Sequence, residues 1–141
     1  MTRHIEPTQE GGAALMRRGL SGSVVMLNLL RFRDVADYTR SPQLAPDAPI
    51  SGADAYRLYA AHTMPFIAAA GGEVLHMGEG GAPLIGPTDE RWDLMLLVQY
   101  PSTQAFMTFA ADPAYLAGAG HRTAALEDSR LLPLGSPAPL S

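Results

Sequence analysis

The sequence predicts an α+β domain of the ferredoxin-like, split βαβ type, with one antiparallel sheet and helices on one of its faces. Two apolar runs, at residues 24–33 and 92–100, are typical of strands. A stretch with helical signals follows each run. The elements then come in the order strand, helix, strand hairpin, strand, helix, strand, and this order is that of the split βαβ fold.

The N-terminal part is predicted to be an arm, residues 1–21, with a short helix at 13–18. The strand at 24–33 follows, and Asn28 is a polar residue in the middle of its apolar run. A buried amide without hydrogen-bond partners would cost about 1–3 kcal/mol. Asn28 therefore needs partners, either backbone groups, other side chains, water or a ligand.

A proline-rich polar insertion occupies residues 34–52. It is long for a loop in a compact domain, which indicates either a functional flap or an arm that lies on another surface. The domain itself is predicted to span residues 22–134, and residues 135–141 are expected to be a disordered tail.

The next helix is predicted to begin after Ser51, which forms a capping box with Asp54, and to end at Gly71. Pro65 is expected to kink it, because proline cannot donate to the carbonyl of the preceding turn. At ~100° per residue, one face has His62 near its middle and is predicted to face the core. This face consists of Ala55, Leu58, Tyr59, His62, Phe66 and Ala69.

The second half of the chain is predicted to start with a hairpin around the glycine-rich segment "GEGGAP". Ser102 caps a short helix, and Asp112 followed by Pro113 starts a further helix that Gly118 and Gly120 weaken. The strands predicted here are 73–78, 82–86, 92–100 and 128–134.

Both faces of the two best strands are apolar, since they do not alternate cleanly between apolar and polar residues. The helices cover one face of the sheet. We expect a second copy of the chain to cover the other, which gives a homodimer that packs sheet on sheet.

Composition excludes several classes of function. The net charge is −4, so the chain lacks the surplus of basic residues that a nucleic-acid binder normally has. All ten basic residues are Arg. Without Lys there is no Schiff base or P-loop lysine, and without Cys there is no thiol nucleophile or cysteine-ligated metal. The N-terminus lacks an apolar signal core and no apolar run is long enough to span a bilayer, so a cytoplasmic location is expected.

Seven segments together resemble a known family: "MLNLLRF", "AYRLYAAH", "AAAGGEVLHMG", "LIGP", "ERWDLMLLVQYPS", "ADPAYL" and "HRTAALEDSRLLPL". The family is an uncharacterised bacterial one, the domain of unknown function thirteen-thirty, in the dimeric α/β-barrel superfamily. The resemblance implies a ferredoxin-like homodimer. The superfamily includes cofactor-free monooxygenases, haem-degrading, dehalogenating and isomerising enzymes, and plain ligand binders, so the fold alone does not select an activity.

Three residues are candidates for catalysis: His62, His121 and Arg122. Either histidine would move a proton, and Arg122 would bind a carboxylate or enolate. The alternative is structural, with His62 bonded to a backbone carbonyl and Arg122 in a salt bridge.

Five residues are candidates for ligand binding, and the alternative for each is a place in the core or in a structural ion pair. They are Asn28, Tyr59, Trp92, Tyr100 and Arg130.

Other chemistries find weaker support. A Ser/His/Asp hydrolase built on Ser129, Asp128 and a histidine would lack the G-x-S-x-G elbow that exposes the serine. A metal site drawn from His62, His76, His121 and Glu73 has no recognised ligand spacing. The segment "GEGGAP" leads into a strand, so it offers no helix N-terminus to a dinucleotide phosphate.

Two hypotheses for function remain. The first is a small-molecule enzyme without an organic cofactor or metal, acting on an aromatic or carbonyl compound in a pocket between helices and sheet. In it Asn28 and Arg122 stabilise an oxyanion. The second is a non-catalytic dimeric ligand-binding or stress-related module. An enzyme should bring Asn28, His62 and Arg122 together in a pocket, whereas a structural module should pair them with the backbone and have no open cavity.

Overall fold

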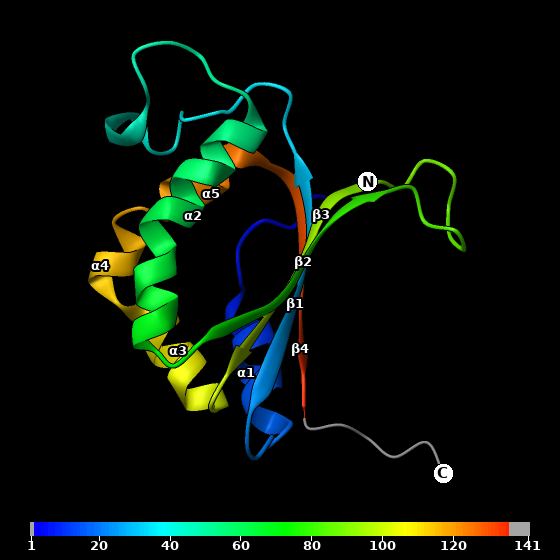
Figure 1. The fold of residues 1–141 in the computed structure, drawn as a ribbon, viewed down its shortest axis with the longest axis vertical. Coiled ribbons are helices and arrows are strands. Elements are labelled where there is room, and N and C mark those ends of the chain that lie inside the picture. Colours follow the sequence, from blue (N-terminus) through cyan, green and yellow to red (C-terminus); the bar gives the residue numbers. More distant parts are fainter. Residues whose placement is uncertain (1, 136–141) are drawn as a thin grey trace.

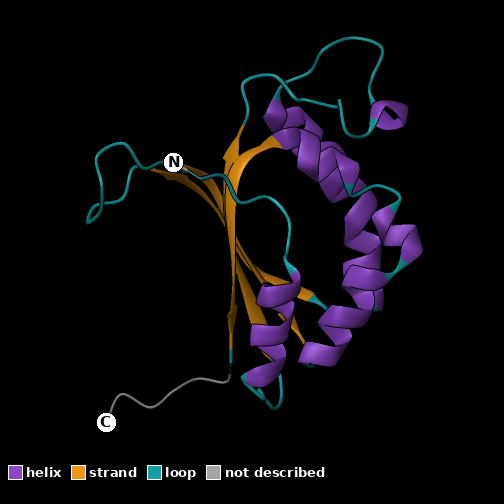
Figure 2. Cartoon of the chain, turned by 180° about the vertical axis from the view of Figure 1, so that it is seen from behind, coloured by secondary structure: helices purple, strands orange, loops and turns teal. Residues whose placement is uncertain are grey.

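A computed structural model describes residues 2–135 of the chain. Four strands form one antiparallel sheet in the order β2-β3-β1-β4. All the helices lie on one side of it, as the two views in Figures 1 and 2 show. The predicted α+β, ferredoxin-like fold is confirmed. The elements in order are α1 (Gln9–Arg17), β1 (Val24–Phe32), the 3-10 turn η1 (Pro42–Leu44), α2 (Gly52–Ala69), β2 (Glu73–Gly81), β3 (Trp92–Tyr100), α3 (Thr103–Ala111), α4 (Pro113–Leu116), α5 (Gly120–Ala125) and β4 (Leu126–Leu134).

The central strand β1 pairs with β3 on one side and β4 on the other, and this register decides which residues share a face. Asn28 lies opposite Leu96, between the buried residues Met26 and Leu30 of its own strand. Because successive side chains alternate between faces, Asn28 points to the side covered by helices.

The core lies between the sheet and the helices in two adjoining clusters. One, below α2 and α3, is built around Val24, Met26, Val98 and Tyr100 and includes Leu15 from α1. The other, below the N-terminal half of α2 and α5, is built around Leu30, Tyr56, Tyr59 and Leu126. Tyr115 packs against both clusters and so joins them.

No helix of residues 2–135 covers the opposite face of the sheet, here called the open face. Its centre is apolar. By register it carries Val25, Leu27, Leu29, Met95, Leu97, Leu132 and Leu134, and all of these are at least partly exposed in the single chain.

The predicted caps form as expected, because they depend on short-range hydrogen bonds. The hydroxyl of Ser51 accepts from the amide of Asp54, and that of Ser102 accepts from Ala105. Asp112 accepts from Ala114 at the start of α4.

Several boundaries differ from the prediction. The second strand of the expected hairpin, 82–86, does not form, and β2 instead continues to Gly81. Here Gly80 lies so close to the carbonyl of Trp92 that a Cβ would sit 2.2 Å from the oxygen, so close strand packing accounts for this glycine rather than a tight turn. The helix after Asp112 breaks at 117–119 into α4 and α5. The helix in the arm starts at Gln9, because Thr8 caps it. The expected tail lies outside the described residues apart from Gly135.

The buried face of α2 is also rotated from the predicted one. Its buried residues are Gly52, Ala55, Tyr56, Tyr59, Thr63 and Ile67. Leu58 is 43% exposed and His62 is half-buried at the edge of the face. The reason is that α2 contacts α5 as well as the sheet, so the buried stripe follows both neighbours.

Candidate functional site

His62 lies on α2 and faces the chain around α4. Its Nε2 is 3.0 Å from the carbonyl oxygen of Ala114 and 3.1 Å from that of Tyr115. Because a carbonyl oxygen can only accept a hydrogen bond, Nε2 must carry a proton. In the neutral ring Nδ1 is then the nitrogen without a proton. Gly118 packs so close that a Cβ there would meet the imidazole ring at 2.3 Å. His62 thus joins α2 to α4.

His121, at the start of α5, pairs with Tyr38 from the insertion. The Tyr38 hydroxyl is 2.7 Å from His121 Nδ1. Burial lowers the pKa of His121, and the nearby positive form of His62 lowers it further. Burial raises the pKa of Tyr38. At neutral pH the phenol is therefore protonated and the imidazole neutral, and the tautomer of the imidazole decides which of the two groups donates.

Arg122 holds the N-terminal arm in place. Its Nη1 donates to the carbonyl of Ile5 over 2.6 Å, and the Ile5 side chain packs against the second core cluster. The amide of His4 donates to Asp128, and the hydroxyl of Ser129 donates to the carbonyl of His4. The arm is thus fixed by several hydrogen bonds, and Arg122, Asp128 and Ser129 use their polar atoms to hold it.

Tyrosines fill the space between α2, α4 and the sheet. The hydroxyls of Tyr59 and Tyr115 are 2.8 Å apart, and Tyr56 stacks beside Tyr59. Burial raises the pKa of Tyr56, Tyr100 and Tyr115. Tyr59 and Tyr100, both predicted to bind ligand, are at most 9% exposed and belong to the core.

Asn28 is half-buried beneath the helices, and its amide nitrogen donates to the carbonyls of Met26 and Leu96, both at 3.3 Å. Its two partners are backbone groups of β1 and β3. This satisfies the requirement that a polar group in the apolar strand have partners.

Trp92 of β3 and Arg130 of β4 contact each other. The guanidinium carbon of Arg130 lies 5.2 Å from the centre of the Trp92 ring, a cation–π contact. Arg130 also pairs with Asp128 at 2.8 Å. Burial alone would raise the pKa of Asp128, but hydrogen bonds from the His4 amide, Arg130 and the Ser129 amide outweigh it and lower the pKa.

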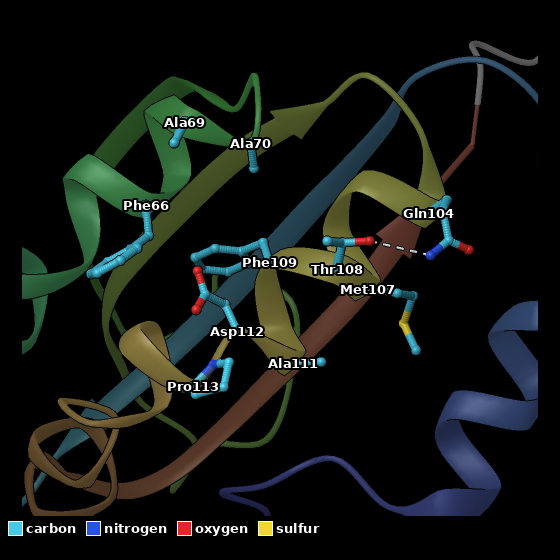
Figure 3. Close-up of a pocket in the computed structure, with 10 residues that line it drawn as sticks. All are labelled: Phe66, Ala69, Ala70, Gln104, Met107, Thr108, Phe109, Ala111, Asp112 and Pro113. Atoms are coloured by element: carbon cyan, nitrogen blue, oxygen red, sulfur yellow. Dashed lines mark hydrogen bonds between the residues drawn. The ribbon is translucent and has the colours of Figure 1, made fainter.

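A depression in the helix layer, here called the α2–α3 groove, has a volume of about 610 Å³. Figure 3 shows its lining from the C-terminal half of α2, from α3 and from the start of α4. Phe66, Met107 and Phe109 supply the large apolar side chains, and Asp112 and the hydrogen-bonded pair Gln104–Thr108 supply polar groups. None of the residues predicted for the site lines it.

Within residues 2–135, no three His, Cys, Asp or Glu side chains gather in an arrangement that would hold a metal ion. The candidate set of His62, His76, His121 and Glu73 therefore does not form such a cluster. His76 and Glu73 lie on the edge strand β2, whereas His62 and His121 lie in the helix layer.

One family model matches a large part of the chain. The model described as "Domain of unknown function (DUF1330)" matches residues 47–132, which is more than half of the sequence. The chain belongs to this family. The match begins within the insertion and ends in β4, so this DUF1330 chain carries α1 and β1 ahead of the matched region.

Two crystal structures of the RPA0582 protein are similar to this DUF1330 chain over its whole length. One is of the methylated protein, with 39% sequence identity, a TM-score of 0.85 and complete coverage of both chains. The other, of a protein of unknown function from Rhodopseudomonas palustris, has 39% identity and a TM-score of 0.84, and covers 98% of this chain and 100% of that one.

A dimeric protein of unknown function with a ferredoxin-like fold, from Bacteroides fragilis, matches with a TM-score of 0.50 and 15% identity, over 83% of this chain and 99% of that one. At this identity the match shows a shared fold. A comparison with curated proteins gives no match. No helix among residues 2–135 combines the length and the apolar character needed to cross a membrane.

Two features of the helix layer of this DUF1330 member were not predicted from its sequence. Tyr38 lies 83 residues from His121, in a segment whose composition indicates only a loop. The α2–α3 groove forms between helices, and only Phe66 among its large residues was on a face predicted for the core. The aromatic content of "TQAFMTFAA" was the one signal that pointed to this surface.

Proposed function

We propose that this protein is a homodimeric ligand-binding module, in which the open faces of two sheets pack together and each protomer binds a small, largely apolar molecule in its α2–α3 groove. The observation that carries the proposal is how three polar side chains use their hydrogen bonds. Asn28, His62 and Arg122 all donate to backbone carbonyls. Because the polar atoms of these three side chains are occupied in holding the fold together, the pairing favours a non-catalytic module over a catalytic constellation built on them.

The open face supports the homodimer. Leu27 lies between Leu97 and Leu132 in the register, and Leu29 lies beside Met95. An apolar sheet face of this extent is the surface that two-layer packing buries, and a twofold axis lets identical surfaces cover each other. The Bacteroides fragilis protein with this fold is described as dimeric.

The dimer has a direct test. Leu27→Glu places a charge at the centre of the open face, and Leu132→Glu changes a side chain that is 52% exposed, so the second variant leaves the fold of the protomer intact. Both variants should elute as monomers in size-exclusion chromatography with light scattering, while Leu116→Glu on the helix layer should remain a dimer. A wild-type monomer near 15.0 kDa would refute the proposal.

The groove suggests the class of ligand. Its volume lies in the range of small-molecule sites, and aromatic and methionine side chains with a few polar groups favour a small aromatic compound. Native mass spectrometry of protein purified from its own host should detect a retained small molecule. Ala111→Trp, inside the groove, should abolish the retention, and Ala117→Trp, at an exposed position outside the groove, should not.

A second candidate function is proton transfer without an organic cofactor, and the Tyr38–His121 pair favours it. A neutral imidazole beside a protonated phenol can relay a proton to a carbonyl compound. If a retained compound is turned over by the purified protein, Tyr38→Phe should lower the rate about 10²-fold. Binding without turnover would leave the binding module as the function.

A further inference from the structure

The loop between β2 and β3, residues 82–91, presents two bare aliphatic side chains at its tip. Leu84 is 101% exposed and Ile85 is 93% exposed, whereas the next most exposed large hydrophobic residue, Val35, reaches 60%. Single exposed apolar residues are ordinary on protein surfaces. Two adjacent ones without any cover are not explained by the fold of one protomer.

The loop projects to the side of the sheet that has no helices. In Figure 1 it extends to the right of the sheet, with the helices on the left, and Figure 2 shows the same arrangement from behind. The loop that carries these two residues therefore lies on the side where the open face needs a partner.

The stem of the loop is fixed by its surroundings. The indole nitrogen of Trp92 donates to Glu90 over 3.1 Å, and the Trp92 ring packs against Arg130, which pairs with Asp128. Asp128 itself is 4% exposed. This chain of contacts connects the stem to β4, two strands away in the sheet.

The tip is also constrained. Pro83 and Gly86 approach so closely that a Cβ on Gly86 would lie 2.7 Å from the Pro83 ring, and the amide of Glu90 donates to the carbonyl of Pro87. A loop with fixed proline φ angles loses little conformational freedom when it binds. It is therefore prepared to hold Leu84 and Ile85 against another surface.

We infer that this loop is a dimerisation arm, which docks Leu84 and Ile85 on the second copy of the chain beyond the edge of the two packed sheets. The second copy is the partner that fits, because the loop projects to the same side of the sheet as the open face, which a second copy is proposed to cover. In a twofold dimer each protomer supplies one arm and receives one. Trp92 and Arg130 act as positioning residues for the arm.

The inference rests on the proposed homodimer, and the absence of cysteine from the chain allows a clean test of each separately. Ile85→Cys, labelled with an environment-sensitive fluorophore, should show blue-shifted emission at high concentration that reverts on dilution as light scattering reports monomers. Leu116→Cys on the helix layer, labelled in the same way, should show no change. If light scattering shows dissociation while the emission of the labelled Ile85→Cys variant stays unchanged, the loop is not a dimerisation arm, although the protein still forms a dimer. A monomer at every concentration would overturn both.

A second measurement asks whether the arm contributes to affinity. The double variant Leu84→Ser with Ile85→Ser should raise the dimer dissociation constant about tenfold or more, since it removes two aliphatic side chains whose burial at the interface is favourable. The matched variant Leu58→Ser with Leu116→Ser changes two exposed leucines of the helix layer and should leave the constant unchanged. Equal dissociation constants for both double variants would contradict the inference.

Discussion

Asp128 shows how one side chain can hold distant parts of the chain together. Its carboxylate accepts from the amides of His4 and Ser129 and from Arg130, so it connects the N-terminal arm, β4 and the stem of the β2–β3 loop. It does so at 4% exposure. The pair "DS" at 128–129, which could suggest a hydrolase, is thus a structural junction.

Asp128→Asn should destabilise the fold at neutral pH by about 1.5–3 kcal/mol, because it weakens charge-assisted hydrogen bonds. The pKa of Asp128 is lower in the folded chain than its ordinary 3.8. The ionised group therefore stabilises the fold above about pH 4, and this contribution is lost as the pH falls through the folded pKa. Urea unfolding should show a large difference from wild type at about pH 7 and a smaller one at about pH 3. The exposed Asp47→Asn variant should show neither.

His121 offers a second test at the residue scale. Burial and then the charge of His62 lower its pKa below 6.5, so its NMR titration midpoint should lie below that value. His62→Gln removes the charge and should move the midpoint upward. Since the folded pKa is depressed, the neutral imidazole stabilises the fold above about pH 6.5, and this stabilisation is lost as the pH falls. A midpoint unmoved by His62→Gln would show that the two rings do not interact.

At the scale of elements, two glycines, one in a helix and one between helices, show where the chain tolerates a side chain and where it does not. Gly12 lies in α1 with no atom within 4 Å of an added Cβ, whereas a Cβ on Gly118 would meet the His62 ring at 2.3 Å. Gly118 thus lets His62 reach the carbonyls of α4.

Gly12→Ala should stabilise the protein by about 0.5–1 kcal/mol, because alanine loses less backbone entropy in a helix. Gly118→Ala should destabilise it by about 1–3 kcal/mol, because the methyl group displaces His62. Chemical denaturation of the two matched variants measures both effects. Similar free energies of unfolding for the two would mean that the contact between His62 and Gly118 is dispensable.

The sequence was sufficient for elements that depend on local signals. The strands at 24–33 and 92–100 and the caps at Ser51, Ser102 and Asp112 form as predicted, because apolar runs and capping hydrogen bonds involve neighbours in the chain. The predicted buried face of α2 was wrong, because α2 also packs against α5, which is more than 50 residues away in the sequence. The close approach of Gly80 to Trp92 likewise depends on strand pairing. The glycine-rich sequence around Gly80 therefore wrongly predicted a tight turn.

The candidate site was less predictable than the fold, since its residues are brought together only by tertiary contacts. Arg122 donates to the carbonyl of Ile5, 117 residues away, where the sequence suggested a salt bridge or a ligand. Trp92 and Arg130, which the sequence suggested as ligand-binding residues, contact each other at the stem of the β2–β3 loop. Composition and spacing identify such residues without identifying their partners.

At the scale of the whole molecule, the two sides of the sheet make opposite demands. The helix side is filled by two aromatic and aliphatic clusters, and Asn28 and His62 donate there to backbone carbonyls. The open face carries a central apolar row, and the β2–β3 loop, which bears the exposed residues Leu84 and Ile85, projects to the same side. A protomer in isolation would expose this surface to water, which is unfavourable by about 25 cal/mol per Å² of apolar area.

Thermal unfolding should therefore depend on protein concentration. Association of folded chains through the open face stabilises them relative to the unfolded chain by mass action, so the Tm of the wild type should rise as the concentration increases. Leu27→Glu should have a lower Tm that does not change with concentration, because its protomers no longer associate. Leu116→Glu, with its charge on the helix layer, should keep the wild-type dependence. Differential scanning calorimetry over a hundredfold range of concentration measures all three, and a wild-type Tm that stays constant would contradict a dimer coupled to folding.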